Sequence, residues 1–346
     1  MSDNTSDEEQ QQQMEEIFIC ADIWLDVFAF LSPFELGQII ALISDRFDRL
    51  VDEHFKTRKL SLGWMEIRRA TDGNGAQIVN ERSSERLPIA QGPIPGKVIG
   101  FEYIWISYVD PTVIEFLQRI CRLVASSGTI VAIYTFVNQS RSWEIICQRI
   151  WPLVNDNICR FRLLDSSQLA RLRQLSPTIL RNCANLRWID SDELFPKFPA
   201  EDNADASSNQ AVAKWLLTPR EDGLPKMLHS DFGLAGIEGL KRAFVNASAP
   251  VNFIFRLPSY SHVTKPFELK NNRTGERLTF RRLNEYKWLL VRCPIGREEA
   301  KWAAWEMEAI EWEWCRQRNY IYINFKDSDI GDGMIEAKAG PSEPKK

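Results

Sequence analysis

Cysteines and histidines are the first residues to consider for chemistry, because they bind metals and act as nucleophiles and bases. The chain has seven cysteines and three histidines, His54, His229 and His262. A zinc site needs closely spaced cysteine or histidine pairs, yet the sequence has no CxxC motif and no histidine near a cysteine. An odd number of cysteines, mostly in apolar segments, is typical of buried thiols in a reducing compartment. We therefore expect no bound metal.

Other catalytic signatures are missing from the sequence. It contains no G-x-S-x-G motif, and the glycine turns DGNG and IGDGM lack the strand-to-helix context of a phosphate loop. The acidic pair Glu298-Glu299 lies at the start of a predicted helix, where carboxylates complement the helix dipole. A catalytic pair of a cysteine nucleophile and a histidine that are far apart in the sequence stays an open alternative. We expect a chain that is not an enzyme and uses no cofactor.

Composition and charge limit the class of partner. The 346 residues include 43 basic and 47 acidic side chains, which gives a net charge of −4. This balance is not the footprint of a protein that binds nucleic acid or an anionic membrane, and no apolar run approaches the roughly 20 residues that span a bilayer. The N-terminus lacks a signal-peptide pattern, so we expect a cytoplasmic or nuclear location. Residues 1–16 and 331–346 are predicted to be disordered tails.

Residues 17–60 predict three short helices. Asp22 is a plausible N-cap for the first, whose apolar residues recur at helical spacing: Trp24, Leu25, Val27, Phe28 and Leu31. Ser32, Pro33 and Glu35 form a capping box with a proline start for the second helix, and the third begins near Ser44. A unit this small rarely buries enough apolar surface alone. The helices should therefore dock on the rest of the chain or on a partner.

The stretch ADIWLDVFAFLSPFELGQIIALISDRFDRL, residues 21–50, resembles an F-box. The residues that stand in the places of that motif are Phe30-Leu31, Pro33, Glu35-Leu36, Leu42-Ile43, Arg46-Phe47 and Leu50. Cys20-Ala21 replaces the Leu-Pro opening of the family, and Phe47 replaces its usual tryptophan. Downstream blocks such as WPLVNDNICRFRLL and WLLVRCPI are similar to a lineage-specific set of nematode F-box proteins.

The resemblance implies a substrate-recognition subunit of an SCF-type (Skp–cullin–F-box) ubiquitin ligase. Such a subunit binds a Skp-type adaptor, and through it a cullin, and holds an unidentified protein target near the ubiquitin-loaded enzyme. The residues expected to contribute to the adaptor-facing surface are Trp24, Leu25, Phe28, Pro33 and Leu36, although some of them must form the F-box core. A diverged F-box without adaptor binding, and an enzyme of unrecognised class, stay open as alternatives.

Strand-like and helix-like segments alternate from residue 98 onward. VIGFEYIWISYV precedes a helical PTVIEFLQRICRLV, and GTIVAIYTF precedes a helical SWEIICQRIWPLV. Units of about 30 residues predict an α/β domain with leucine-rich-repeat-like strand–helix repeats over residues 61–330. The segment 71–97, rich in Gly, Pro and charge, is predicted to be an exposed loop.

The same rhythm continues toward the C-terminus. FELKNNRTGERLTFRRL predicts a hairpin, residues 297–319 a long helix, and YIYINF a final strand. One face of the long helix is expected in the core, with Trp302, Trp305, Ala309 and Trp312.

Alternation along the strands predicts which sheet face carries which side chains. Tyr103 and Trp105 share one face, while Ile104 and Ile106 share the face that helices would cover. A repeat solenoid usually binds its partner on the open sheet face, and Tyr, Trp and Arg often anchor interfaces. The predicted target-binding patch contains Tyr103, Trp105, Arg160, Arg162 and Arg187. A register shift of one residue, or a later segment that covers the sheet, would remove this patch.

Overall fold

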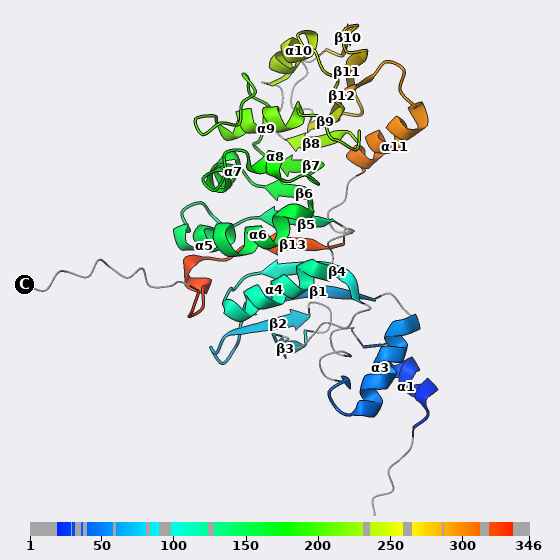
Figure 1. Cartoon of the computed structure of the whole chain (residues 1–346), viewed down its shortest axis with the longest axis vertical. Helices are drawn as coiled ribbons and strands as arrows, with labels where there is room; N and C mark the ends of the chain where they lie inside the picture. The colour runs from blue at the N-terminus through cyan, green and yellow to red at the C-terminus, as the bar shows by residue number, and fades with distance from the viewer. Residues whose placement is uncertain are drawn as a thin grey trace, which may run out of the picture. The chain divides into compact units, whose positions relative to one another are not determined.

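The structure is a computed structural model that describes residues 19–28, 30, 31, 36, 40–57, 60–80, 84–89, 98–123, 128–230, 236–258, 265–285, 287–311 and 318–334. The chain divides into two compact units, Met1–Lys59 and Leu60–Lys346. Figure 1 labels the helices and strands of both units.

The first unit contains the helices α1 (Ala21–Phe28) and α3 (Asp45–Thr57). Their apolar sides meet around Phe28, which is 1% exposed and whose ring lies 6.4 Å from Phe47 and 5.8 Å from His54. Trp24 packs edge-on against Phe47 at 4.8 Å. The predicted first and third helices are confirmed. Most of the predicted second helix lies outside the described residues.

The second unit is built on one large sheet. Its strand order is β10-β11-β12-β9-β8-β7-β6-β5-β13-β4-β1-β2-β3, and the eight neighbours from β9 to β1 run parallel. The predicted α/β class is confirmed as a mixed fold with a large, mostly parallel sheet. The strands are β1 (Leu60–Arg69), β2 (Ala76–Asn80), β3 (Arg86–Pro88), β4 (Val98–Ile106), β5 (Thr129–Ile133), β6 (Ile158–Leu163), β7 (Trp188–Ser191), β8 (Lys226–Ser230), β9 (Phe253–Pro258), β10 (Phe267–Asn271), β11 (Glu276–Arg282), β12 (Lys287–Pro294) and β13 (Tyr320–Ile323).

Most helices of the second unit lie on one side of the parallel strands, as Figure 1 shows for α4 to α9. Ile104 and Ile106, on the face predicted to meet these helices, are fully buried. Tyr103 and Trp105, on the opposite face, are half-buried. The predicted register of this strand is therefore correct. The helices are α4 (Pro111–Leu123), α5 (Ser140–Ile145), α6 (Trp151–Val154), α7 (Ser166–Arg173), α8 (Ile179–Asn182), α9 (Ser208–Leu216) and α10 (Ile237–Val245).

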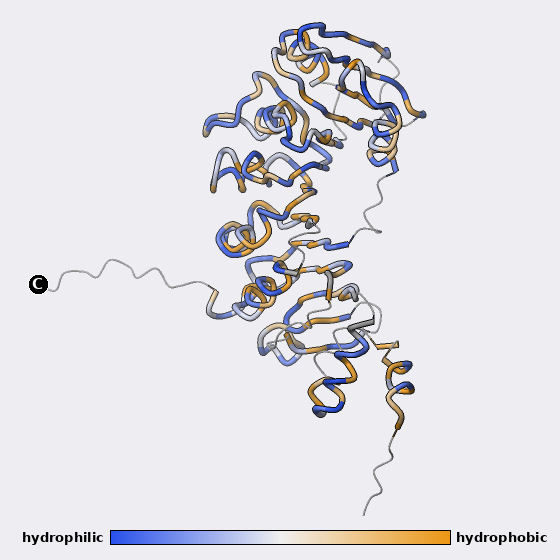
Figure 2. The backbone as a smooth tube through the Cα atoms, turned by 45° about the vertical axis from the view of Figure 1, so that its right-hand side comes forward, coloured by the Kyte–Doolittle hydropathy of each residue, from blue (hydrophilic) through white to orange (hydrophobic). Residues whose placement is uncertain are grey.

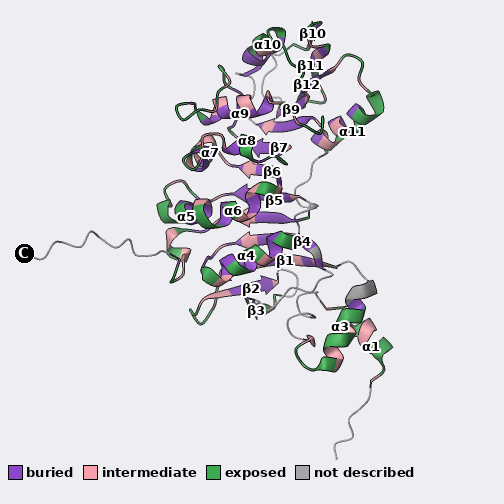
Figure 3. Ribbon diagram, in the orientation of Figure 1, coloured by how far each residue is buried: buried purple, intermediate pink, exposed green. Residues whose placement is uncertain are grey.

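Hydrophobic and burial patterns agree with this layering. Hydrophobic and hydrophilic residues alternate along the backbone of the second unit (Figure 2). Buried residues are concentrated in the parallel strands, and the helices show exposed residues on their outer sides (Figure 3). One part of the core of the second unit therefore lies between the sheet and this helical layer.

The last strand, β13, lies between β4 and β5 and pairs in parallel with both. Asn319 precedes it with a φ of 57° and joins the two neighbours. Its Oδ1 accepts a hydrogen bond from the backbone N–H of Phe101 at 3.1 Å, and its Nδ2 donates to the carbonyl oxygen of Gly128 at 3.4 Å. The sequence predicts a final strand, but not this position within the sheet.

Helix α11 (Glu299–Ile310) lies on the opposite side of the sheet from α4 to α9 (Figure 1). Its buried Trp302 and Ala309 belong to one cluster with residues of β7, β8, β9 and β12: Trp188, Met227, Ile254, Leu289, Val291 and Cys293. The expectation of a core position is confirmed for Trp302 and Ala309, whereas Trp305 is half-buried and packs against this cluster. Trp312 lies outside the described residues. This part of the second sheet face is thus covered by a helix.

The predicted exposed loop over residues 71–97 is wrong in part. The short strands β2 and β3 add to the edge of the sheet there, and Ile78 and Leu87 are buried. Glycines, prolines and charges around these strands resemble turn composition. Pairing with β1 supplies the context that makes AQIVN a strand, which local composition does not reveal.

Candidate functional site

Two rows of side chains cross the parallel strands on the face that carries Tyr103. The first row contains Trp64, Tyr103, Tyr320, Ile130, Arg160 and Trp188. The second row, two residues further along each strand, contains Glu66, Trp105, Tyr322, Ala132, Arg162, Asp190, His229 and Arg256. The rows change from mainly aromatic over β1, β4 and β13 to mainly charged over β6 to β9.

The aromatic part of this face is a ladder of packed rings. Tyr103 stacks on Trp64 at 4.7 Å and on Tyr320 at 5.0 Å, with ring planes only 17° and 10° apart. Tyr322 continues the ladder to Tyr134 at 4.9 Å. Burial, together with the nearby phenols of Tyr103 and Tyr134, raises the pKa of Tyr320, because a phenolate would be poorly solvated there. The hydroxyl of Tyr320 therefore stays protonated around neutral pH.

Trp105 lies beside this ladder, with its ring edge-to-face against Tyr322 at 5.8 Å. Its indole Nε1 is buried and has no hydrogen-bond partner among the described residues. An unpaired buried donor costs about 1–3 kcal/mol. The contribution of Trp105 to this face is therefore aromatic surface, and no hydrogen bond explains its presence.

Glu308 of α11 engages two of the three predicted arginines. One carboxylate oxygen lies 2.8 Å from Nη2 of Arg160 and the other 2.9 Å from Nη2 of Arg187. Arg160 also lies over the ring of Trp188 at 4.8 Å. Burial lowers the pKa of Arg160, although Glu308 opposes this. Both arginines are thus paired with α11, and their role in target binding stays a prediction.

Arg162 lies next to the aromatic ladder. Its guanidinium is 4.0 Å from Asp190 and 5.8 Å from the ring of Tyr134. Asp190 is 2% exposed and lies 2.9 Å from Nδ1 of His229. Burial is the largest influence and opposes the charged form of Arg162, but Asp190, together with Tyr134, Tyr320 and Asp192, outweighs it, and the pKa of Arg162 is raised. Arg162 is therefore a fixed positive charge at the border of the ladder.

Three predicted residues are thus brought together with two that sequence reasoning missed. We call this set the aromatic patch, and it consists of Tyr103, Trp105, Tyr134, Arg162 and Tyr322. Tyr134 follows β5 and Tyr322 belongs to the inserted β13. The alternation in YIYINF could have placed Tyr320 and Tyr322 on one face, but not on the face of Tyr103.

The structure also separates the five residues predicted for adaptor binding. Phe28 and Leu36 are 1% and 0% exposed, so they are interior residues and not contact residues. Trp24 and Leu25 are half-buried, and Pro33 lies outside the described residues. Phe28 is interior because the side of α1 that carries it faces α3.

Another set of apolar side chains is exposed in the first unit. The exposed apolar set consists of Ile23 (56% exposed), Val27 (40%), Phe30 (90%), Leu42 (77%) and Ile43 (60%). Ten large hydrophobic side chains are exposed among all described residues, so half of them fall in this small unit. Concentrated exposed apolar surface marks interaction sites. In the sequence, the first helix carries more apolar residues than one buried face needs, and Ile23 and Val27 of this set belong to it.

Comparison with protein-family models, with characterised proteins and with solved structures finds no match for this chain. In the part of the chain that the structure describes, no three His, Cys, Asp or Glu side chains are grouped so that they could hold a metal ion. None of the described helices has the length and hydrophobicity that crossing a membrane requires.

Proposed function

We propose that this chain is a substrate-recognition subunit of an SCF-type ubiquitin ligase. Its first unit binds a Skp-type adaptor as an F-box does, and its second unit binds a protein target. The observation that carries the proposal is the exposed apolar set on a small separate unit. The F-box-like order of residues 21–50 supports it independently. The chain would act by proximity, since it raises the concentration of the target near the ubiquitin-loaded enzyme.

The adaptor-binding surface in this proposal is the exposed apolar set. Full burial of one large apolar side chain contributes about 1.5–3 kcal/mol, so even partial burial of this set supplies several kcal/mol toward binding. Phe28 and Leu36 are interior residues and do not belong to this surface. The strand–helix order of the second unit favours a leucine-rich-repeat-like domain that presents the aromatic patch to the target.

A double substitution in the exposed turn tests the adaptor surface. Leu42→Asp with Ile43→Asp places two charges in the proposed interface, but both positions are exposed and the first unit should stay folded. We expect loss of co-purification with a Skp-type adaptor. Val245→Asp is the matched control, because Val245 is 61% exposed on α10 of the second unit. Equal adaptor binding by the double variant and the control would contradict the proposal.

The target surface is tested with Trp105→Ala combined with Arg162→Ala. This double variant removes aromatic area and the fixed charge of the aromatic patch. We expect loss of target capture with unchanged adaptor binding. Glu268→Ala is a control, because its side chain is 46% exposed on the edge strand β10. Target capture at the wild-type level would exclude the aromatic patch, and loss of both activities would indicate unfolding.

A further inference from the structure

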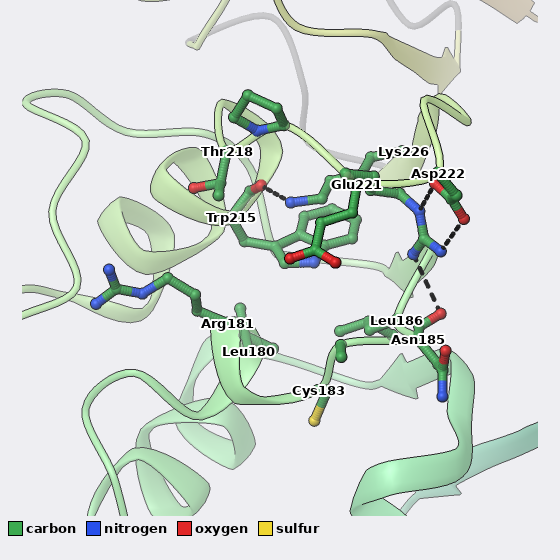
Figure 4. A pocket seen from close by; sticks show the side chains of 13 residues that line it. Leu180, Arg181, Cys183, Asn185, Leu186, Trp215, Thr218, Glu221, Asp222 and Lys226 are labelled. Carbon is green, nitrogen blue, oxygen red and sulfur yellow. Dashed lines mark hydrogen bonds and ion pairs between the residues drawn. The ribbon is translucent and has the colours of Figure 1, made fainter.

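A cavity of about 410 Å³ opens at the amino-terminal ends of β7 and β8 (Figure 4). Its walls come from α8, the segment that leads into β7, the end of α9 and the segment that leads into β8. Apolar surface is supplied by Leu180, Leu186 and Trp215. The cavity is separate from the aromatic patch, and no sequence motif indicated it.

Lys226, the first residue of β8, lines this cavity although its side chain is almost fully buried, with 6% exposure. Its Nζ donates a hydrogen bond to the carbonyl oxygen of Trp215 at the end of α9 and lies 5.0 Å from the centre of the Trp215 ring. Among the described residues, no carboxylate forms an ion pair with Lys226. A buried ammonium without a counter-ion is costly, which favours the neutral amine.

The charged groups around the cavity strengthen this preference. Asp222 is bound by Arg220 at 2.6 Å, and Arg181 is bound by Asp202 at 3.0 Å. The remaining acid in the lining, Glu221, is exposed. Burial, and then the positive charge of Arg220, lower the pKa of Lys226 to about 7. About half of the Lys226 side chains are therefore neutral amines at neutral pH.

We propose that Lys226 is a nucleophilic amine that binds small aromatic aldehydes covalently in this cavity. A desolvated lysine beside another cation is an established way to activate an amine. The neutral amine keeps its hydrogen bond to the Trp215 carbonyl oxygen and still has a lone pair. An aromatic ring on the ligand would find apolar contacts with Trp215 and Leu186. This inference is independent of the adaptor function.

The bond changes balance without an oxidant or a reductant. The Nζ lone pair adds to the aldehyde carbon, and the carbonyl oxygen takes a proton that the nitrogen releases. The resulting carbinolamine loses its hydroxyl group and a proton as water, which leaves an imine between Lys226 and the ligand. Hydrolysis reverses the reaction, so the site is reversible in the absence of a trapping reagent.

Reductive trapping on the full chain tests the proposal. The protein is treated briefly with benzaldehyde and sodium cyanoborohydride at pH 7, and labelled lysines are identified by peptide mass mapping. An ordinary lysine amine, with a pKa near 10.4, is neutral in about one molecule of 2,500 at this pH. The neutral fraction of Lys226 at this pH is roughly one half. We therefore expect labelling of Lys226 to be at least ~50-fold faster than labelling of Lys301, whose side chain is 63% exposed.

The pH profile distinguishes an activated amine from a merely accessible one. The rate at Lys226 should level off above about pH 8, whereas labelling of ordinary lysines should keep rising toward pH 10. Lys226→Arg should abolish only this label and leave the other lysines unchanged. Labelling of Lys226 no faster than Lys301, or labelling only after urea unfolding, would overturn the proposal. Lys226 would then serve only to cap the end of α9.

Discussion

Asn319 links the two strands on either side of β13, and replacing this residue should weaken the second unit. Asn319 is 5% exposed, and its side chain links Phe101 at β4 to Gly128 before β5. In Asn319→Ala the buried N–H of Phe101 loses its acceptor, which costs about 1–3 kcal/mol. Alanine at a φ of 57° adds about 1 kcal/mol of strain. The free energy of unfolding should therefore fall by about 2–4 kcal/mol.

Two further substitutions separate these contributions. Asn319→Gly also removes the hydrogen bonds, but glycine adopts the positive φ without strain, so it should be about 0.5–1 kcal/mol more stable than Asn319→Ala. Asn324→Ala is the matched control just after β13. Its side chain makes no hydrogen bond in the part of the chain that is described, and we expect a change within about 0.5 kcal/mol.

A double-mutant cycle with Gly100 provides the strictest test of this placement. A Cβ atom at Gly100 would overlap Oδ1 of Asn319. Gly100→Ala should therefore cost at least about 1 kcal/mol more in the wild type than in Asn319→Gly. Urea unfolding followed by tryptophan fluorescence reports on the second unit, because eleven of the twelve tryptophans, all except Trp24, lie there. Additive effects of the two substitutions would refute the position of Asn319 between β4 and β5.

Three other perturbations give distinct outcomes. The pKa of Lys226 is about 7 in the folded chain and near 10.4 when unfolded, so the unfolded state binds more protons between these values. In urea unfolding, the stability of the wild type relative to Lys226→Met should therefore rise by about 1.2 kcal/mol per pH unit on average from pH 7 to 9, and a flat difference would contradict the low pKa. Glu308→Ala removes the carboxylate that pairs with Arg160 and Arg187. The free energy of unfolding should therefore fall by about 1–3 kcal/mol, and hydrogen exchange in α11 should increase. Unchanged exchange would show that Glu308 does not hold this helix. Phe28→Ala should lower the free energy of unfolding of the first unit by about 3–5 kcal/mol, because a buried ring is lost. The first unit should then become sensitive to protease while the second unit stays resistant. A protease-resistant first unit would contradict the assignment of Phe28 to the core.

Local patterns predicted the elements and the faces of the sheet well. The period of two in FEYIWISY placed Tyr103 and Trp105 opposite Ile104 and Ile106, and burial of both isoleucines confirms it. The apolar stripe with Trp302 and Ala309 predicted a buried helix face. These features depend on neighbours within about ten residues, and such neighbours are adjacent in the sequence.

Non-local placement could not be predicted in the same way. Nothing within YIYINF specifies that this strand enters between β4 and β5, because its partners lie about 190 and 220 residues earlier. The salt bridges of Glu308 with Arg160 and Arg187 join segments that are 148 and 121 residues apart. The buried pair Arg292 and Glu276, 2% and 1% exposed, is also invisible as a motif. The sequence predicted the arginines on the correct face but not the helix that covers them.

The residues predicted for adaptor binding show a related limit. An apolar residue on a short helix serves either the core or a partner, and both uses give the same helical spacing. Only the position of α3 decides that Phe28 is interior while Ile23 and Val27 are exposed. The apolar excess of the first helix was the usable signal, and it indicated a surface without identifying its members.

Direct titration of the full chain with a purified Skp-type adaptor is the measurement that tests the central claim. Isothermal titration calorimetry should show saturable one-to-one binding with a negative heat-capacity change, because apolar side chains become buried. The double variant Leu42→Asp and Ile43→Asp should give no such binding under the same conditions. Absence of binding by the wild-type chain, with both units folded, would contradict the proposed function.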